Sequence, residues 1–378
     1  MPPVRLRHIH LPCSPSQGTF PSYQTAAALQ ELLRRRQLEY QDADSSSPSN
    51  SGLTPPHPTL ISFTPQPTYT LGRRQAPTHT ASSSPAPSSL SPAEISRLKA
   101  PLHVRLSSAR SLPTQGLAPT GAEKNTDAHP HTEHVFHPSV LTSPRGGLAT
   151  YHGPGQVVLW PVMVINSSTR ALGHKHFTVR CYSRLLERTT ISLLRRLFGL
   201  AGFTTDDPGV WVRTPPAPGS LGGGGHGNGD GEARKISALG IHLRRHVSSL
   251  GAALNLDMPT TRAVGSVAAA AAATTTMTTQ RRGEAEADEE VNPWERFVAC
   301  GLAGKGVTCV EEELLAAGGT GIPGLDSEVV ARAWAEELAE GMGLGAQAVE
   351  LVGRDEADEL VAAARRDGYV DAARGDEL

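Results

Sequence analysis

The sequence predicts one α+β domain that is interrupted by long polar insertions. The 378 residues would suit about two or three domains by length, but 38 glycines, 30 prolines and a hydrophobic content of 38% are too loop-rich for a chain that is globular throughout. The predicted strands come in groups rather than in strict alternation with helices, which is typical of the α+β class.

Five segments have the composition of insertions between core elements. They are rich in proline, serine, threonine, glycine or alanine, and they bury too little apolar surface to offset chain entropy. They cover residues 42–58, 76–92, 111–131, 214–232 and 260–290. Without them a core of about 220–250 residues remains, the size of a single domain. We expect that domain over residues 1–350, and a charged C-terminal tail or solvated helix over residues 351–378.

The N-terminal stretch is open to two interpretations. Residues 4–11 read VRLRHIHL, and their alternation is typical of a first strand. The arginines and histidines, with no acidic residue before Glu31, also resemble a short organelle presequence. We favour the strand.

Apolar spacing predicts the other core elements. Leucines near one side indicate a helix over residues 23–40, and Thr59–Phe63 is a predicted strand. Residues 178–198 carry apolar side chains at helical spacing, with Gly199 as the stop signal. Further strands are predicted over residues 157–165, 209–212, 235–241 and 252–256. Asp326 is the expected cap of a last helix that buries Val329, Val330, Ala333, Trp334 and Leu338.

Charge, hydropathy and cysteine content narrow the classes of function. A net charge of −2 gives no electrostatic reason to expect nucleic acid, and the apolar run over residues 157–165 is far shorter than the roughly 20 residues that cross a bilayer. The four cysteines are sparse and irregularly spaced, so a reducing compartment is expected rather than a disulfide framework. A histidine-rich tract over residues 129–137 lacks a coherent ligand set, and we expect no metal site.

Three segments contain residues suited to catalysis. RGGLATYHGPGQVVLWP, residues 145–161, combines flexible backbone with His152, although a tight connection before a buried strand would look the same. Lys235 begins an apolar strand and is either a solvated flank or a buried amine with a shifted pKa. Cys300 follows an apolar run at a glycine-rich turn, where a cysteine is either simply buried or a nucleophile beside a base.

The order of these motifs resembles the lipoyl(octanoyl) transferase family, whose members are octanoyl-acyl-carrier-protein:protein N-octanoyltransferases. The matching blocks are PTYTLGRRQ (67–75), RGGLATYHGPGQVVLWP (145–161), DPGVWV (207–212), RKISALGIHLRRHVSSLGAALNLD (234–257) and NPWERFVACGLAGKGVT (292–308). The resemblance implies the fold of biotin and lipoate protein ligase catalytic domains, which is a mixed, largely antiparallel sheet with flanking helices. It covers nearly all of the predicted core.

The resemblance also implies the chemistry. Octanoyl would pass from the phosphopantetheine thiol of acyl carrier protein to a lysine of a lipoyl domain, in a 2-oxoacid dehydrogenase E2 subunit or the glycine cleavage H protein. Cys300 and Lys235 would be catalytic, without a separate cofactor or metal. The implied substrate-binding residues are Arg145, Gly146, Gly147, Leu148, Ala149, Thr150, Tyr151, His152, Ala238, Leu239, Gly240, Gly251, Ala252 and Ala253.

Two departures from the family pattern leave alternatives open. Leu250 stands where the family carries histidine, and Ala299 stands where it carries proline. The alternatives are an ATP-dependent lipoate or biotin protein ligase and a non-catalytic relative that binds lipoyl domains. The family function indicates a mitochondrial location, or a cytoplasmic one if the N-terminus is not a presequence.

Overall fold

The computed structural model describes the core of the chain. It covers residues 4–46, 55–75, 90–107, 131–166, 173–214, 232–261, 288–297, 305–319, 322 and 325–369. Most residues of the five predicted insertions lie outside these ranges, as does Cys300, so their interpretation stays a prediction.

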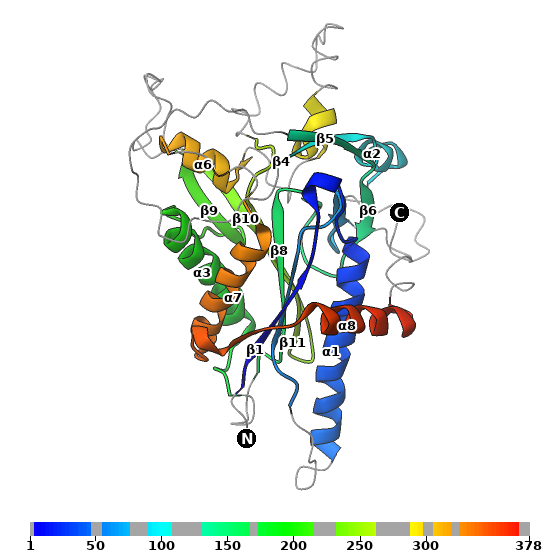
Figure 1. Ribbon diagram of the computed structural model, residues 1–378, viewed down its shortest axis with the longest axis vertical. Helices are drawn as coiled ribbons and strands as arrows, with labels where there is room; N and C mark the ends of the chain where they lie inside the picture. Colours follow the sequence, from blue (N-terminus) through cyan, green and yellow to red (C-terminus); the bar gives the residue numbers. More distant parts are fainter. Residues whose placement is uncertain are drawn as a thin grey trace, which may run out of the picture.

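A mixed sheet forms the centre of the described structure (Figure 1). Its strands run in the order β12-β10-β11-β8-β2-β1-β13, with β9 also paired to β10. Their bounds are β1 Leu6–Leu11, β2 Thr59–Phe63, β8 Gln156–Val162, β9 Gly209–Thr214, β10 Glu232–Arg244, β11 Val247–Asn255, β12 Gly306–Val307 and β13 Val349–Leu351. The long pairs β9–β10, β10–β11, β11–β8 and β8–β2 are antiparallel, whereas β1 pairs in parallel with β2 and β13, as does β12 with β10. The predicted α+β class and the predicted first strand are confirmed.

Helices cover both faces of this sheet. On one face α3 (Val179–Phe198) packs against α7 (Ser327–Met342), and their apolar side chains join one hydrophobic cluster with the sheet. On the other face α1 (Tyr23–Ser46) packs against α8 (Arg354–Arg366) and joins a second cluster. The two pairs lie on opposite sides of the sheet in Figure 1. Each sheet face is thereby removed from water, which is the main driving force for this arrangement.

The helix boundaries show which signals in the sequence were reliable. The Thr178 side chain accepts from the amide of Cys181, and Gly199 ends α3 in the left-handed conformation. Asp326 caps α7 as predicted, and Val330 and Trp334 are fully buried, whereas Val329 is only half-buried. Helix α1 continues to Ser46, so its predicted end at residue 40 and the predicted start of an insertion at residue 42 were wrong.

The C-terminal segment is not a tail over its described length. Strand β13 pairs with β1, and α8 buries Ala357, Leu360 and Ala364 in the cluster beneath α1. Its charged residues occupy the outer side, so the helix is amphipathic, and of the two alternatives the helix rather than the tail is observed over residues 354–366. Residues 370–378 lie outside the described ranges.

Smaller elements lie around one end of the main sheet. They are β3 (Thr68–Leu71), β6 (Ser139–Thr142) and β7 (Thr150–His152) in one sheet, the hairpin of β4 (Leu102–Ser107) and β5 (His131–Phe136), and the short helices α2 (Pro92–Leu98) and α6 (Val310–Ala316). The described ranges also contain three short 3-10 helices, η1 (Pro15–Gln17), η3 (Pro293–Arg296) and η5 (Ala346–Ala348). Tyr69, Tyr151 and Trp294 pack their rings together here in a third hydrophobic cluster.

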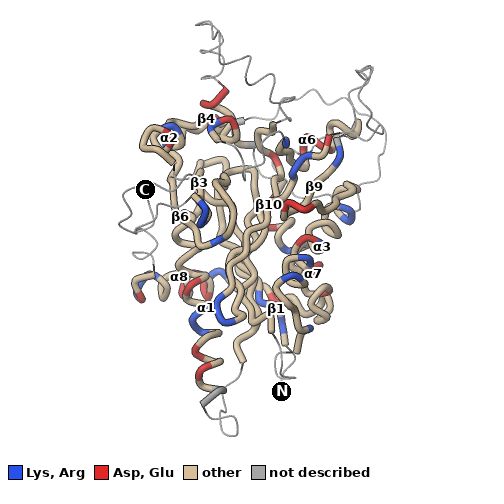
Figure 2. The backbone as a smooth tube through the Cα atoms, turned by 180° about the vertical axis from the view of Figure 1, so that it is seen from behind, with Lys and Arg blue, Asp and Glu red and all other residues tan. Residues whose placement is uncertain are grey.

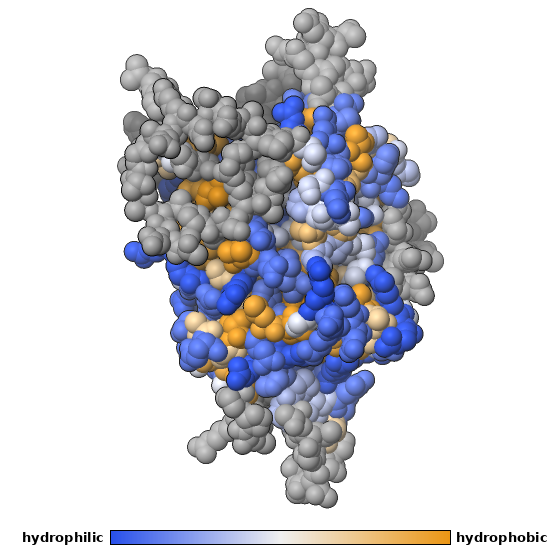
Figure 3. Space-filling model, in the orientation of Figure 1, coloured by the Kyte–Doolittle hydropathy of each residue, from blue (hydrophilic) through white to orange (hydrophobic). Residues whose placement is uncertain are grey.

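The described surface is mainly hydrophilic in the orientation of Figure 3, with apolar residues in separate patches. No helix in the described ranges has the length and apolar character needed to span a membrane.

Candidate active site

The predicted glycine-rich segment forms a loop that connects β6 to β7. Its Arg145 carbonyl accepts a hydrogen bond from the Arg73 amide, 3.0 Å away, just after β3. The Arg145 guanidinium is almost fully buried and donates from Nη2 to Thr70 Oγ1 at 2.9 Å and from Nη1 to the Leu148 carbonyl at 2.7 Å. These bonds fix the loop at the end of the small sheet. Gly146 remains exposed, and Gly147 and Leu148 are half-buried.

Arg145 also brings the loop against β10. A Cβ atom at Gly240 would lie 2.8 Å from Arg145 Cδ, so only glycine permits this contact without a shift of the arginine. The pairing of β10 with β11 places Ala238 opposite Ala253 and Gly240 opposite Gly251. Three of the predicted substrate-binding segments are therefore neighbours in space.

The members of these segments differ in burial. Ala238, Leu239 and Gly240 are half-buried, whereas Gly251, Ala252 and Ala253 are buried in the sheet. A Cβ atom at Gly251 would lie 2.2 Å from the Leu159 carbonyl oxygen, so this glycine allows β11 to pack on β8. Ala149, Thr150 and Tyr151 are likewise buried. The accessible part of the predicted set is the Gly146–Leu148 turn and the middle of β10.

Lys235 lies on the same face of β10 as Gly240. A bulge between Lys235 and Ser237 shifts the alternation of side chains along the strand. Ile236 and Leu239 consequently face the α3 cluster, on the side opposite to Lys235. The Lys235 side chain is buried, its Nζ donates to the Pro208 carbonyl at 3.0 Å, and it lies 4.8 Å from the centre of the Trp211 ring. The solvated-flank interpretation of Lys235 was wrong.

A chain of buried hydrogen bonds connects His152 to the Lys235 backbone. His152 Nδ1 is 2.7 Å from Gln156 Oε1, and Gln156 Nε2 donates to Asn255 Oδ1 at 2.9 Å. Asn255 Nδ2 donates to the Thr308 carbonyl at 2.9 Å, and the Thr308 amide donates to the Lys235 carbonyl at 3.0 Å. Because the Gln156 amide group donates to Asn255, its oxygen accepts from His152, and the imidazole proton therefore sits on Nδ1.

Burial keeps this imidazole neutral. The pKa of His152 is lowered to about 4, chiefly by burial; the Gln156 bond opposes the shift and the positive charge of Arg145 adds to it. The ring also stacks on Tyr23 at the start of α1, with 5.6 Å between ring centres. Gln156 and Asn255 were missed in the sequence, where the only signal was a polar residue beside an apolar run.

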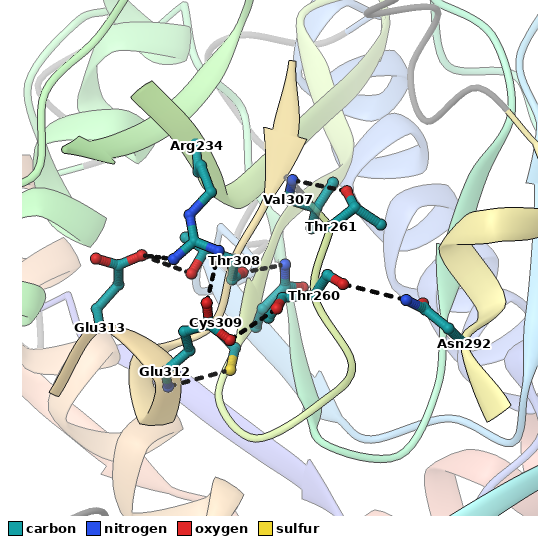
Figure 4. A network of polar contacts seen from close by, with 10 residues as sticks. Arg234, Thr260, Thr261, Asn292, Val307, Thr308, Cys309, Glu312 and Glu313 are labelled. Carbon is teal, nitrogen blue, oxygen red and sulfur yellow. Dashed lines mark hydrogen bonds and ion pairs between the residues drawn. The ribbon is translucent and has the colours of Figure 1, made fainter. Parts of the chain in front are cut away.

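A second polar network fixes β12 beside Lys235 (Figure 4). Arg234 is fully buried and donates from Nη1 to Glu312 at 2.8 Å and from Nη2 to Glu313 at 2.7 Å. Thr308 Oγ1 donates to Glu313 at 2.6 Å. Strand β12 therefore lies directly alongside β10, with Val307 opposite Lys235.

Burial keeps the Cys309 thiol protonated and unreactive. It raises the pKa of the thiol to about 11, and the sulfur accepts from the Glu312 amide at the start of α6. Cys309 is therefore a capping residue in the core.

The backbone at Leu250 adopts a conformation that leucine rarely takes. Its φ is +61°, its amide donates to Gln30 Oε1 at 2.6 Å, and its side chain is buried in the α1 cluster. Leu250 thus fills a packing position on β11.

A cavity of about 900 Å³ lies between β4, the end of β1 and the start of α7, and Tyr151 of the predicted substrate-binding set is part of its wall. Its wall includes Phe20, Leu102, Gln156, Met258 and Asp326, but neither Arg145 nor Lys235.

Residues 134–295 match the family model of the lipoyl protein ligase A/B catalytic domain. This segment is similar to that catalytic domain. It includes the Arg145 loop, the His152 network and Lys235, so the resemblance seen in the motifs is confirmed.

Alignments with curated relatives extend the similarity beyond the matched segment. The chain is 28% identical over 293 residues to the mitochondrial octanoyl-[acyl-carrier-protein]:protein N-octanoyltransferase LIPT2 of Danio rerio, which covers 78% of this chain and 79% of the relative. It is 33% identical over 170 residues to LIPT2 of Xenopus tropicalis, an alignment that covers 45% of this chain and 47% of the relative. An octanoyltransferase of Myxococcus xanthus is 36% identical over 118 residues, an alignment that covers 31% of this chain and 28% of the relative. The last two alignments thus span less than half of each relative.

A solved structure of a bipartite lipoate protein ligase from Thermoplasma acidophilum superposes with a TM-score of 0.43 at 12% identity, covering 95% of this chain and 91% of that one.

Proposed function

We propose that this chain is an octanoyltransferase of lipoate biosynthesis. It takes octanoyl from the phosphopantetheine thiol of acyl carrier protein and passes it to the lysine amine of a lipoyl domain. The observation that carries this proposal is the placement of Lys235, whose amine is buried on the face of β10 that meets the Arg145 loop. The names of the relatives support the substrate.

Cys300 is the proposed nucleophile. Cys300 is six positions before Gly306, where β12 starts, and Val307 pairs with Lys235, so at most about 22 Å of chain separates Cys300 from the start of β12. That tether allows the thiol to meet the Lys235 amine. A nearby ammonium stabilises a thiolate, which is the reactive form of cysteine.

The reaction then proceeds in two balanced steps. The Cys300 thiolate forms a bond to the octanoyl carbonyl carbon while the bond to the carrier sulfur breaks, and the carrier thiol leaves with a proton donated by Lys235. In the second step the acceptor amine attacks the Cys300 thioester, and the cysteine sulfur leaves. Lys235, now neutral, accepts the proton that the amine loses, which restores the ammonium beside the thiolate.

The other residues have positioning roles in this proposal. The hydrogen bonds from His152 through Gln156, Asn255 and Thr308 hold the Lys235 backbone at the bulge of β10. Ala238 and Gly240 form the half-buried stretch of β10 beside the Arg145 side chain along which we place the substrate. Each methylene buried there contributes about 0.8 kcal/mol to binding.

Partners and location follow from the proposed reaction. The donor is octanoyl-acyl carrier protein, and the acceptors are lipoyl domains of 2-oxoacid dehydrogenase E2 subunits and of the glycine cleavage H protein. We place the enzyme in mitochondria, because the Danio and Xenopus relatives are named as mitochondrial. No cofactor beyond the carrier arm is part of the proposal.

Transfer without ATP tests the proposal against a ligase. The protein is incubated with a lipoyl domain and either octanoyl-carrier protein or free octanoate with ATP and magnesium. We expect octanoylation of the lipoyl domain from the carrier alone, measured by mass. Modification only from octanoate with ATP would establish the ligase instead, and modification from neither would favour a non-catalytic binding module.

A further inference from the structure

Two exposed arginines lie at the edge of the candidate active site. Arg73 follows β3, and its amide is bonded to the carbonyl of Arg145. Arg244 ends β10 on the face that carries Gly240 and His242, because Ile241 and Leu243 face the α3 cluster. Figure 2 shows the basic positions near β3 and β6 on the side of the molecule that is turned away in Figure 1.

Both arginines lie close enough to His242 for their positive charges to act on its ring, where the Glu31 carboxylate opposes them. The pKa of His242 lies below its ordinary value, first because the ring is partly buried and then because of Arg34, Arg73 and Arg244. Its Nδ1 is held by Ser249 Oγ at 3.3 Å. Arg73 is bonded to Arg145, whose side chain packs against Gly240, and His242 and Arg244 follow Gly240 on the same face of β10. Arg73, His242 and Arg244 therefore lie in one region of the surface, which we call the arginine rim.

Nearby arginines are neutralised, whereas the rim is not. Arg34 and Arg35 both contact the Glu31 carboxylate, and Arg245 is bonded to Asp42. Among the described residues, neither Arg73 nor Arg244 takes part in an ion pair. Two uncompensated guanidinium groups at one point favour an anion, and a phosphate oxygen group matches their planar donors.

We propose that Arg73 and Arg244 bind the phosphodiester of the phosphopantetheine arm of the acyl donor. This inference rests on the proposed function, since it assigns the donor its orientation in the same site. The arm carries its anion at one end and its thiol at the other, joined by an extended chain with a pair of amide groups.

The spacing along β10 fits this orientation. Lys235 and His242 are seven positions apart on one strand, and after allowance for the bulge this corresponds to about 20 Å. The arm then runs along the half-buried Ala238–Gly240 stretch, past the Arg145 loop, with its thioester at Lys235. The polar end binds at the rim and the acyl end reaches the reactive groups.

Small donors separate the phosphate from the rest of the carrier. Initial rates are measured with S-octanoyl-4′-phosphopantetheine and with S-octanoyl-pantetheine, which lacks the phosphate, for the parent chain, Arg73→Gln, Arg244→Gln and the double variant. Arg188→Gln is the matched control, because Arg188 is an exposed arginine of α3 on the opposite face of the sheet. We expect KM for the phosphorylated donor to rise about tenfold in the double variant. The dependence of this KM on salt concentration should become weaker than in the parent chain. KM for the other donor and both values for the control should not change.

Three outcomes would overturn the inference. The first is an equal change in KM with both small donors, and the second is no change with either. The third, seen when octanoyl-acyl carrier protein is assayed in parallel, is a weakening with the intact carrier protein only, which would place the rim against the carrier's own surface. If the parent chain transfers octanoyl from no donor, the proposed function fails, and calorimetric binding of 4′-phosphopantetheine to the same variants then decides on the rim by itself.

Discussion

At the scale of single residues, the account centres on the environment of Lys235. The contacts of its amine with the Pro208 carbonyl and the Trp211 ring are made inside the protein, and Lys305 lies over the same ring at 5.3 Å. A lysine in such a place is positioned for proton transfer rather than for solubility. Neighbouring positions in the sequence do not reveal this burial, because Trp211 and Pro208 come from β9 and the loop before it.

Replacing Lys235 with alanine tests its role. We expect the rate of transfer to fall by about 10²-fold or more, because the proton acceptor is lost. The melting temperature should stay close to that of the parent chain. Lys235→Arg keeps the charge but does not deprotonate, so it should be nearly as inactive. A parent-like rate in either variant would show that the assignment of Lys235 is wrong.

The buried imidazole of His152 predicts a dependence of stability on pH. Its pKa in the folded chain, about 4, is below the ordinary value of 6.5, so the unfolded chain binds the proton more tightly. The stabilisation is complete above pH 6.5 and is lost as pH falls toward 4. In His152→Gln, the free energy of unfolding measured in urea should therefore fall less steeply between pH 6.5 and 4. His8 is also buried, with its pKa lowered to about 3, so part of the slope should remain. An unchanged slope would contradict this account.

At the scale of elements, caps and apolar periodicity predicted α3 and α7 well. Thr178, Gly199 and Asp326 act locally, so the sequence alone identifies them. The small sheet of β3, β6 and β7 was missed because its strands are short and their pairing is not local. The same holds for the Gln156–Asn255 bond, which joins positions 99 residues apart and exists only because β8 pairs with β11.

Arg234 is predicted to hold the β10–β12 pair together. Arg234→Met leaves Glu312 and Glu313 without their buried partner, and we expect a loss of about 3 kcal/mol in the free energy of unfolding. Arg196→Gln is the control, because its ion pairs with Glu336 and Glu337 are exposed and should contribute less than about 1 kcal/mol. Equal losses in the two variants would contradict this role for Arg234.

At the scale of the whole molecule, the sequence blocks that resemble the family are the ones that meet in the fold. The Arg145 loop, the Lys235 strand and the strand after Cys300 are far apart in the chain, yet the sheet order places them side by side. The charged C-terminal segment was harder to predict because α8 is stabilised by α1, which lies more than three hundred residues earlier.

The ends of one predicted insertion are already joined by strand pairing. Thr214 of β9 lies opposite Glu232 of β10 in an antiparallel register. Replacing residues 215–231 with Asn-Gly should therefore preserve the hairpin, because this pair favours tight turns. We expect the melting temperature and the transfer rate to stay near those of the parent chain. Cooperative unfolding at a much lower temperature would show that the segment contributes to the core.

The central claim is that octanoyl is carried on Cys300, with Lys235 beside it. The most direct measurement is the intact mass of the protein after brief incubation with octanoyl-carrier protein in the absence of an acceptor. We predict a gain of one octanoyl group in the parent chain, its release when a lipoyl domain is added, and no gain in Cys300→Ser. Absence of the adduct from the parent chain while transfer still occurs, or an equal adduct in Cys300→Ser, would contradict the account.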